Sequence, residues 1–398
     1  MALETCPVCG GANSIAFLCR DQVPVHQNLV MTELAEALAA PRGKLDLLAC
    51  EDCGFVFNRA FDPAKLAYGR DYDNTQSHSA YFDAYLDQRV ARMVQVHGVR
   101  NAAVVEVGCG KGHFLRKLVD YSGAANRGFG FDPSYVGPDT DLDGRLVFRR
   151  CFYDASCSHV PADVVVCRHV IEHLPDPLAL LGALRAALAH SPHARVFFET
   201  PCVEWILRNR VMWDLFYEHC SLFSGASLRL AFERSGFVVE RVEQVFGGQY
   251  LWLEARPSAA ALPASPGLAA SPGPAASGTA LLAHDFGVDE HALRQQWLER
   301  LAELRRQGKL ALWGAGAKGV TFANLVDPDR ALLDCVVDIN PNKQGCFIPV
   351  TGHAIVAPQA LCGRAIRNLI LMNPNYRQET LQLLQAAGSD ANLLDWSE

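Results

Sequence analysis

Three glycines and two acidic residues in the first third of the chain have a spacing suited to nucleoside binding. The first acidic residue and the three glycines lie two residues apart from one another, at Glu106, Gly108, Gly110 and Gly112. An apolar run before them predicts a buried strand, and residues 113–119 after them predict a helix. Glycine permits a tight turn and close approach of the backbone to a ligand. Asp132 follows Gly112 by 20 residues, where its carboxylate can accept hydrogen bonds from a ribose. The pattern predicts a nucleoside site at the carboxyl ends of the strands of a doubly wound sheet.

Two C-x-x-C pairs near the start of the chain predict a metal site. The four cysteines are Cys6, Cys9, Cys50 and Cys53, and a glycine follows each pair. Four thiolates bind zinc tetrahedrally and leave no open position, so the predicted ion is structural. The alternatives are coincidental cysteines or a redox pair. A redox C-x-x-C usually begins a helix in a thioredoxin-like setting, which this sequence does not predict.

Composition divides the chain into four segments. Residues 256–280 are rich in Pro, Ala and Ser and carry no charge after Arg256, which predicts a connector. We therefore predict a zinc-binding domain, a central domain, a linker and a C-terminal domain at 1–68, 69–256, 257–280 and 281–398. In the central domain a helix over 81–97 precedes apolar strands near 102–107, 127–131, 162–167 and 194–199. Such alternation predicts an α/β fold with a parallel sheet. Closing antiparallel strands are expected at 238–245 and 250–254.

The Gly-x-Gly-x-Gly loop followed by Asp132-Pro133-Ser134 resembles motifs I and II of class I S-adenosylmethionine (SAM) methyltransferases. This resemblance implies SAM as cofactor. It places Arg168 and His169, after the fourth strand, beside the methionine half of SAM, and Phe152 near the adenine. His169 as a simple cap of the strand and Phe152 as a core aromatic are alternatives.

The whole chain is similar to zinc-containing SAM-dependent sugar C-methyltransferases. The resemblance rests on the two cysteine pairs, the run Tyr217-Glu218-His219, and C-terminal motifs at 313–319, 337–345 and 373–376. It implies a zinc domain, a class I core and a C-terminal Rossmann-like domain that closes over substrate. Residues 23–29 and 71–79, where substrate would be touched, depart from the family pattern, so the acceptor need not be the family's usual deoxysugar.

Methylation of a carbon beside a carbonyl requires a base for the α-proton and a group that stabilises the enolate. The resemblance assigns His219 as the base, assisted by Tyr217 and Glu218, and histidine suits this task because its pKa lies near working pH. Tyr217 is expected at the enolate oxygen, and Tyr72 is a weaker candidate for the same cleft. The alternative is that Tyr217 and His219 are polar groups on a loop with no catalytic part.

A second glycine motif favours a rival function. Gly314, Gly316 and Gly319 match G-x-G-x-x-G, and Asp338 follows 19 residues after Gly319. On motif rules alone this predicts a dinucleotide site and an NAD-dependent oxidoreductase or bifunctional enzyme. Methylation of nitrogen or oxygen in another small metabolite is a further alternative, as is a noncatalytic SAM-binding protein. A substrate anion held by Lys318 is another use for this loop.

The composition of the chain limits which classes of binding partner are expected. The 398 residues carry a net charge of −7 with no long basic run, which argues against nucleic acid. No signal peptide and no run of roughly 20 apolar residues is visible, so no membrane association and a cytoplasmic location are expected. The expected partner is a small molecule, possibly a nucleotide-linked keto sugar in sugar biosynthesis or secondary metabolism. The methylated atom, the pathway and the oligomeric state are left open.

Overall fold

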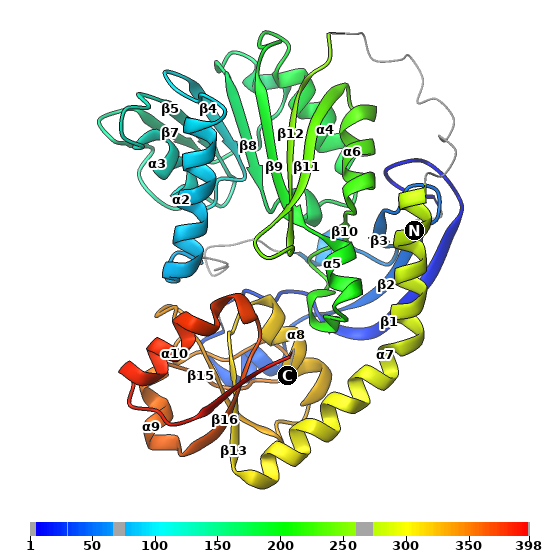
Figure 1. The fold of residues 1–398 in the computed structure, drawn as a ribbon, viewed down its shortest axis with the longest axis vertical. Helices are drawn as coiled ribbons and strands as arrows, with labels where there is room; N and C mark the ends of the chain where they lie inside the picture. Colours follow the sequence, from blue (N-terminus) through cyan, green and yellow to red (C-terminus); the bar gives the residue numbers. More distant parts are fainter. Residues whose placement is uncertain (1–4, 30, 67–75, 260–273, 397–398) are drawn as a thin grey trace.

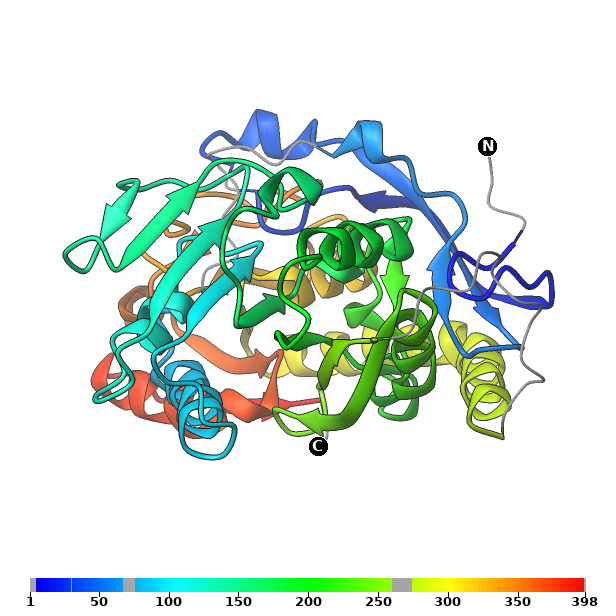
Figure 2. The ribbon, with the colours of Figure 1, turned by 90° about the horizontal axis from the view of Figure 1, so that it is seen from above.

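The computed structural model describes residues 5–29, 31–66, 76–259 and 274–396. Its strands form three sheets, one for each predicted domain (Figure 1). Seen from above, the N-terminal segment runs along one side of the molecule and the C-terminal helix α10 lies on the opposite side (Figure 2).

The N-terminal sheet is antiparallel and has the order β1-β2-β3-β10. Its strands are β1 (Ser14–Pro24), β2 (Arg42–Cys50), β3 (Val56–Asn58) and β10 (Ser221–Leu222), with a short helix α1 (Leu34–Leu38) between β1 and β2. Strand β10 comes from the middle of the chain, so a strand from outside the segment 1–68 completes the N-terminal sheet. The two residues of β10 follow Tyr217-Glu218-His219 closely and fix this run against the N-terminal sheet.

The central sheet has the order β11-β12-β9-β8-β4-β5-β7-β6. Its strands are β4 (Ala103–Val107), β5 (Arg127–Phe131), β6 (Thr140–Asp141), β7 (Leu146–Arg149), β8 (Val164–Arg168), β9 (Arg195–Pro201), β11 (Phe237–Val245) and β12 (Tyr250–Pro257). The five from β7 to β9 are parallel, and β11 and β12 close the sheet antiparallel as predicted. Strand order reverses between β4 and β8, which is where such sheets bind ligands.

The helices of the central domain are α2 (Ala80–Gln95), α3 (His113–Val119), α4 (Pro177–Ala187), α5 (Val203–Arg208) and α6 (Gly225–Arg234). Helix α3 begins directly after the glycine loop, with Gly112 as its N-cap at φ 74°. Helix α2 begins after Ser79, whose hydroxyl accepts a hydrogen bond from the Phe82 amide. The α/β fold predicted for this part of the chain is therefore confirmed.

The C-terminal sheet is wholly parallel, in the order β15-β14-β13-β16-β17. Its strands are β13 (Lys309–Trp313), β14 (Leu333–Val337), β15 (Ile355–Val356), β16 (Ile366–Leu371) and β17 (Asn392–Asp395), and its helices are α7 (Pro274–Gln307), α8 (Ala317–Val326), α9 (Leu361–Arg364) and α10 (Arg377–Ala386). Helix α7 begins at Pro274, within the segment 257–280 that the sequence predicts as a linker. Proline suits the first turn of a helix and alanine favours its continuation.

Helix α7 joins the N-terminal and C-terminal sheets. It runs along β1 (Figure 1), where Phe286 packs edge-on against Phe17 and Glu290 pairs with Arg20 at 2.9 Å. A continuous cluster of buried apolar side chains extends from β1 and β2 to β13 and α8. Among the described residues, no helix is long and apolar enough to cross a membrane.

Candidate functional site

The first glycine loop connects β4 to α3 at the strand-order reversal. Gly108, Gly110 and Gly112 all have left-handed backbone angles, with φ of 68°, 52° and 74°. A Cβ on Gly108 would lie 2.2 Å from the Val170 side chain, so this glycine is needed for packing. At Gly110 no described atom beyond its chain neighbours lies within 4 Å of that position. The open space lies where the sequence predicted close approach of a ligand.

Asp132 ends β5 beside this loop. Its Oδ2 accepts a hydrogen bond from the Gly110 amide at 2.8 Å, and its Oδ1 accepts from the Ser134 amide at 2.8 Å. The carboxylate is only partly buried, so it can also accept from ribose hydroxyls. Pro133 follows on the exposed rim of the site.

Glu106 is the innermost of the predicted cofactor residues. It is 3% exposed, and its Oε2 has no hydrogen-bond partner among the described residues. Burial raises the pKa of this carboxyl to about 8, opposed by the nearby Arg168 charge. A buried polar atom without a partner points to a missing ligand or water, which fits the predicted role of Glu106 in the cofactor pocket.

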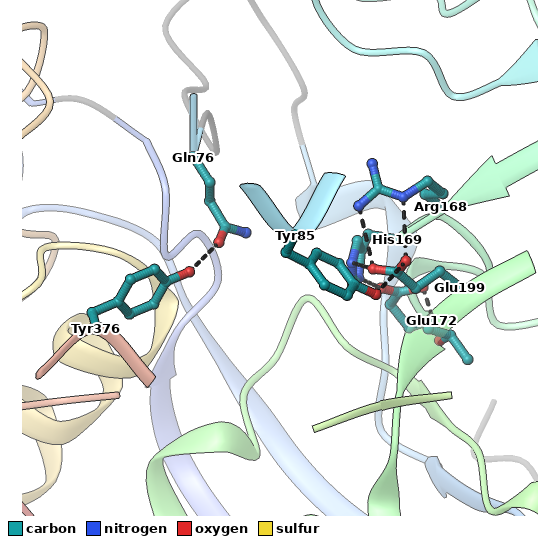
Figure 3. A network of polar contacts seen from close by, with 8 residues as sticks. Gln76, Tyr85, Arg168, His169, Glu172, Glu199 and Tyr376 are labelled. Atoms are coloured by element: carbon teal, nitrogen blue, oxygen red, sulfur yellow. Dashed lines mark hydrogen bonds and ion pairs between the residues drawn. The ribbon is translucent and has the colours of Figure 1, made fainter. Parts of the chain in front are cut away.

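Arg168 and His169, at the end of β8, are held by a buried carboxylate that the sequence analysis missed. Glu199 on β9 is fully buried and binds both side chains, with Arg168 Nη2 at 3.2 Å and His169 Nε2 at 2.9 Å. Tyr85 of α2 donates to the same carboxylate at 2.9 Å. A second buried carboxylate, Glu172, lies 3.2 Å from His169 Nδ1 (Figure 3).

This network gives His169 a positive charge at neutral pH. Burial alone would lower the pKa of the imidazole, but hydrogen bonds to Glu172 and Glu199 raise it to about 9. Burial opposes ionisation of Glu199, yet Arg168 and His169 hold the pKa of its carboxyl at about 2. His169 also has a left-handed backbone at φ 55°, a conformation that non-glycine residues adopt at a cost and that clusters at functional sites.

His219 lies next to this network. One ligand atom each of Glu172, His173 and His219 fall within 4.8 Å of one another, and the two imidazole rings meet edge to face at 4.8 Å between centroids. The buried Nδ1 of His219 has no hydrogen-bond partner in the described part of the chain. Burial, followed by the charge of His173, lowers the pKa of His219 well below its usual value. The imidazole is therefore neutral and can accept a proton, but the lowered pKa makes it a weaker base than the free imidazole on which the sequence prediction was based.

The two neighbours of His219 have other partners. The Tyr217 hydroxyl accepts a hydrogen bond from the Asp62 amide at 2.9 Å, and its ring fills the space that a Cβ on Gly43 would need. Since that hydroxyl is used by the backbone after β3, we assign Tyr217 no direct part in the reaction. Glu218 is fully buried and accepts from the Gln27 amide at 3.0 Å. It therefore contacts the segment that departs from the family pattern.

The remaining candidates lie at the edge of the site or outside it. Tyr72 falls outside the described residues. Phe152 is 73% exposed at the carboxyl end of β7, so it is not a core aromatic, and its ring is accessible for stacking on an adenine. Glu199 and Tyr85 were not among the predicted site residues. For Glu199, the presence of a carboxylate within the apolar run 194–199 was a usable signal.

The four cysteines predicted to bind zinc come together. Their sulfurs lie within 4.8 Å of one another, with Cys6 and Cys53 at 3.6 Å and Cys9 and Cys50 at 3.5 Å. Tetrahedral zinc with bonds of about 2.3 Å separates its sulfurs by roughly 3.8 Å. The amides of Gly10 and Gly54 donate to the carbonyls of Cys6 and Cys50 and form two matching knuckles. The donor set and its spacing fit a closed structural zinc site.

The second glycine loop, between β13 and α8, is covered by the chain itself. The side-chain oxygen of Asn28 lies 4.0 Å from the Cβ position of Gly316. Lys343 Nζ donates to Asn28 at 3.3 Å and to the Ala315 carbonyl at 3.1 Å. Lys318, considered above for a substrate anion, is ion-paired with Asp214.

Comparison with known proteins defines the class. Residues 78–242 match the methyltransferase domain family, and residues 278–391 match the C-methyltransferase C-terminal domain family. Together with the strand order of the central sheet, these matches make the chain a SAM-dependent methyltransferase with a class I fold.

One curated relative matches along almost the whole chain. It is the C-methyltransferase NovU of Streptomyces niveus, 24% identical over 391 residues that cover 95% of this chain and 91% of NovU.

Two solved structures resemble part of the chain. One is the 1,6-didemethyltoxoflavin-N1-methyltransferase of Burkholderia thailandensis, with 16% identity, a TM-score of 0.34, and coverage of 46% of this chain and 82% of that one. Another is the magnesium protoporphyrin IX methyltransferase of Synechocystis PCC 6803, with 19% identity, a TM-score of 0.32, and coverage of 45% and 84%. Likenesses this low do not identify a substrate.

Proposed function

We propose that the protein transfers the methyl group of SAM to a carbon atom of a small keto substrate, with a nucleotide-linked keto sugar as the first candidate. The relative NovU is a C-methyltransferase, and the match over 278–391 is to a domain of that class. The observation that carries the proposal is the neutral His219, with its unpartnered buried Nδ1, beside the carboxyl end of β8.

The residues divide the work by position. Glu106, Gly108, Gly110, Gly112 and Asp132 would hold the nucleoside, and Arg168 and His169 would face the methionine half. SAM, when bound, supplies an electrophilic methyl group. His219 accepts the α-proton of the keto substrate, and the resulting enolate carbon then attacks the methyl group. The positive charge of His169 lies near this carbanionic centre and favours the build-up of negative charge on the substrate.

Zinc has a structural part in this proposal. Cys6, Cys9, Cys50 and Cys53 would hold one ion that fastens β2 to the N-terminal turn. The site lacks a position for substrate, so the ion takes no part in methyl transfer.

Deuterium exchange tests the proposal. A panel of nucleotide-linked keto sugars is incubated in heavy water with the enzyme and S-adenosylhomocysteine (SAH), which cannot donate a methyl group. If His219 removes the proton, the substrate exchanges deuterium at the carbon to be methylated, and the His219→Asn variant does not exchange it. His190→Asn is the control, because His190 is exposed and lies between α4 and the start of β9, away from the carboxyl ends of the strands. Equal exchange in wild type and His219→Asn would make His219 structural, and methylation of nitrogen or oxygen without exchange would overturn the C-methyltransferase proposal.

A further inference from the structure

The motif Asn373-Pro374-Asn375-Tyr376 and the start of α10 contact the central domain at two places. The Asn373 and Gln249 side-chain amides bond each other reciprocally, at 2.8 and 3.1 Å, and both residues are buried. Asn375 Nδ2 donates to the Phe246 carbonyl at 3.1 Å. The Tyr376 hydroxyl donates to Gln76 at 2.9 Å (Figure 3). The turn between β11 and β12 and the approach to α2 are thus both tied to the C-terminal domain.

Glu379 on α10 makes the shortest of these contacts. Its Oε2 accepts a hydrogen bond from the Ser79 hydroxyl at 2.6 Å, and its Oε1 accepts from the Ala80 amide at 2.6 Å and the Tyr81 amide at 3.4 Å. The first amides of a helix have no hydrogen-bond partner within the helix, and a carboxylate at this end also interacts favourably with the helix dipole. A side chain 300 residues away in sequence therefore caps α2.

Helix α2 connects this cap to the network at the methyl-donor site. Tyr85, which lies six residues after Ser79, donates to Glu199, and Glu199 holds both Arg168 and His169. Aromatic rings form a second route to the same network, through the turn between β11 and β12. Tyr376 packs on Phe246 at 6.1 Å, Phe246 stacks on Tyr250 at 4.9 Å, and Tyr250 meets the His169 ring at 4.6 Å.

We propose that Glu379 is a positioning residue for methyl transfer: by capping α2 it holds Tyr85 on Glu199, and so sets Arg168 and His169 for the methyl donor. Residues 373–379 then act as a latch between the C-terminal and central domains. The inference rests on the proposed function only in taking the carboxyl end of β8 as the methyl-donor site. It does not require a particular acceptor or a particular base.

The test measures SAH affinity by calorimetry and amide exchange in the first turn of α2 by mass spectrometry. In Glu379→Ala, exchange at residues 80 and 81 rises about tenfold, the usual effect of losing a helix cap, and SAH binds about tenfold more weakly. Glu379→Gln, whose amide oxygen still accepts a hydrogen bond, loses less of both. Gln378→Ala on the same helix is the control, because Gln378 is exposed, and it changes neither.

A double-mutant cycle separates positioning from simple stabilisation. Tyr85→Phe removes the donor to Glu199 and weakens SAH binding while α2 stays protected from exchange. Because Glu379 acts through Tyr85, the double variant binds SAH no more weakly than the worse single variant. Additive losses, or faster exchange in Glu379→Ala with unchanged SAH affinity, would make Glu379 only a structural cap and overturn the proposal. Neither measurement uses a methyl acceptor, so both can be interpreted even if the C-methylation proposal fails.

Discussion

The two glycine loops of this chain begin from the same local design and end in different surroundings. In each loop, the aspartate that follows the next strand accepts a hydrogen bond from a backbone amide of the loop. Asp132 accepts from the Gly110 amide at 2.8 Å, and Asp338 accepts from the Ala315 amide at 2.7 Å. Each aspartate also accepts from the amide two residues later, at 2.8 Å. Judged by these contacts alone, both loops are ready for a nucleoside.

The difference lies in what faces each loop. The Cβ position of Gly110 points into open space, whereas the Asn28 side-chain oxygen lies 4.0 Å from the Cβ position of Gly316, the equivalent glycine of the second loop. Asn28 and Lys343 cover the second loop from the N-terminal and C-terminal parts of the chain. A glycine motif therefore specifies a turn, and the remainder of the fold decides whether a ligand can reach it.

The largest effect is expected from breaking the zinc site. Cys53→Ser removes one of four ligands, and structural zinc contributes on the order of 10 kcal/mol to small domains of this kind. We expect loss of bound zinc and a large loss of folded protein, because β1 and β2 also carry the segment that covers the second loop. Metal analysis and thermal melting check this, with the exposed Cys19 changed to Ser as control. A metal-free protein of full stability would contradict it.

His219→Asn is expected to reduce methyl transfer by roughly 10²–10⁴-fold, the usual contribution of a general base. SAH affinity should stay within about twofold, because His219 lies outside both glycine loops. Steady-state kinetics on the accepted substrate and calorimetry measure the two quantities. A variant that loses SAH binding to the same extent as activity would show that His219 supports the cofactor pocket instead.

Strands β4, β5, β8 and β9 were predictable from the sequence because alternating apolar runs mark parallel strands, and the helix over 113–119 was located to the residue. The short strand β7, which also belongs to the parallel part of the central sheet, was not predicted. The contacts that surround these elements could not be predicted from the sequence in the same way. Glu199 lies inside an apolar strand and reads as part of the core, and its partners Tyr85 and Arg168 come from distant segments. The cover over the second loop depends on Asn28, nearly 300 residues from Gly316, so no local pattern reveals it.

The two aspartates provide a matched pair of smaller effect. Asp132→Ala should weaken SAM binding roughly 10- to 100-fold, since a hydrogen bond to a charged group contributes about 1.5–3 kcal/mol. Asp338→Ala, which removes the equivalent carboxylate from the covered loop, should leave SAM affinity unchanged. Calorimetry on both variants decides whether the loops differ in function. Equal losses would mean that these aspartates act only on loop structure or general stability.

The smallest expected effect is a pH dependence of stability caused by His169. Its pKa is raised to about 9 in the folded protein, above the unfolded value of about 6.5. The stabilisation is therefore fully present below pH 6.5 and is lost as the pH rises through 9. Because the side chain is partly exposed, we expect only on the order of 1 kcal/mol. Between pH 6 and 9.5 the melting temperature should fall more steeply with pH for wild type than for His169→Gln. Parallel curves of melting temperature against pH would contradict the positive charge assigned to His169.

The central claim is that the methyl donor binds at the first glycine loop and that the second binds no nucleotide. The direct measurement is SAM and NADH titration of Gly110→Val and Gly316→Val, two changes at equivalent places in the two loops. We expect Gly110→Val to abolish SAM binding, Gly316→Val to retain it, and NADH to bind neither the variants nor the wild type. Unchanged SAM affinity in Gly110→Val, or tight NADH binding that is lost in Gly316→Val, would contradict the account.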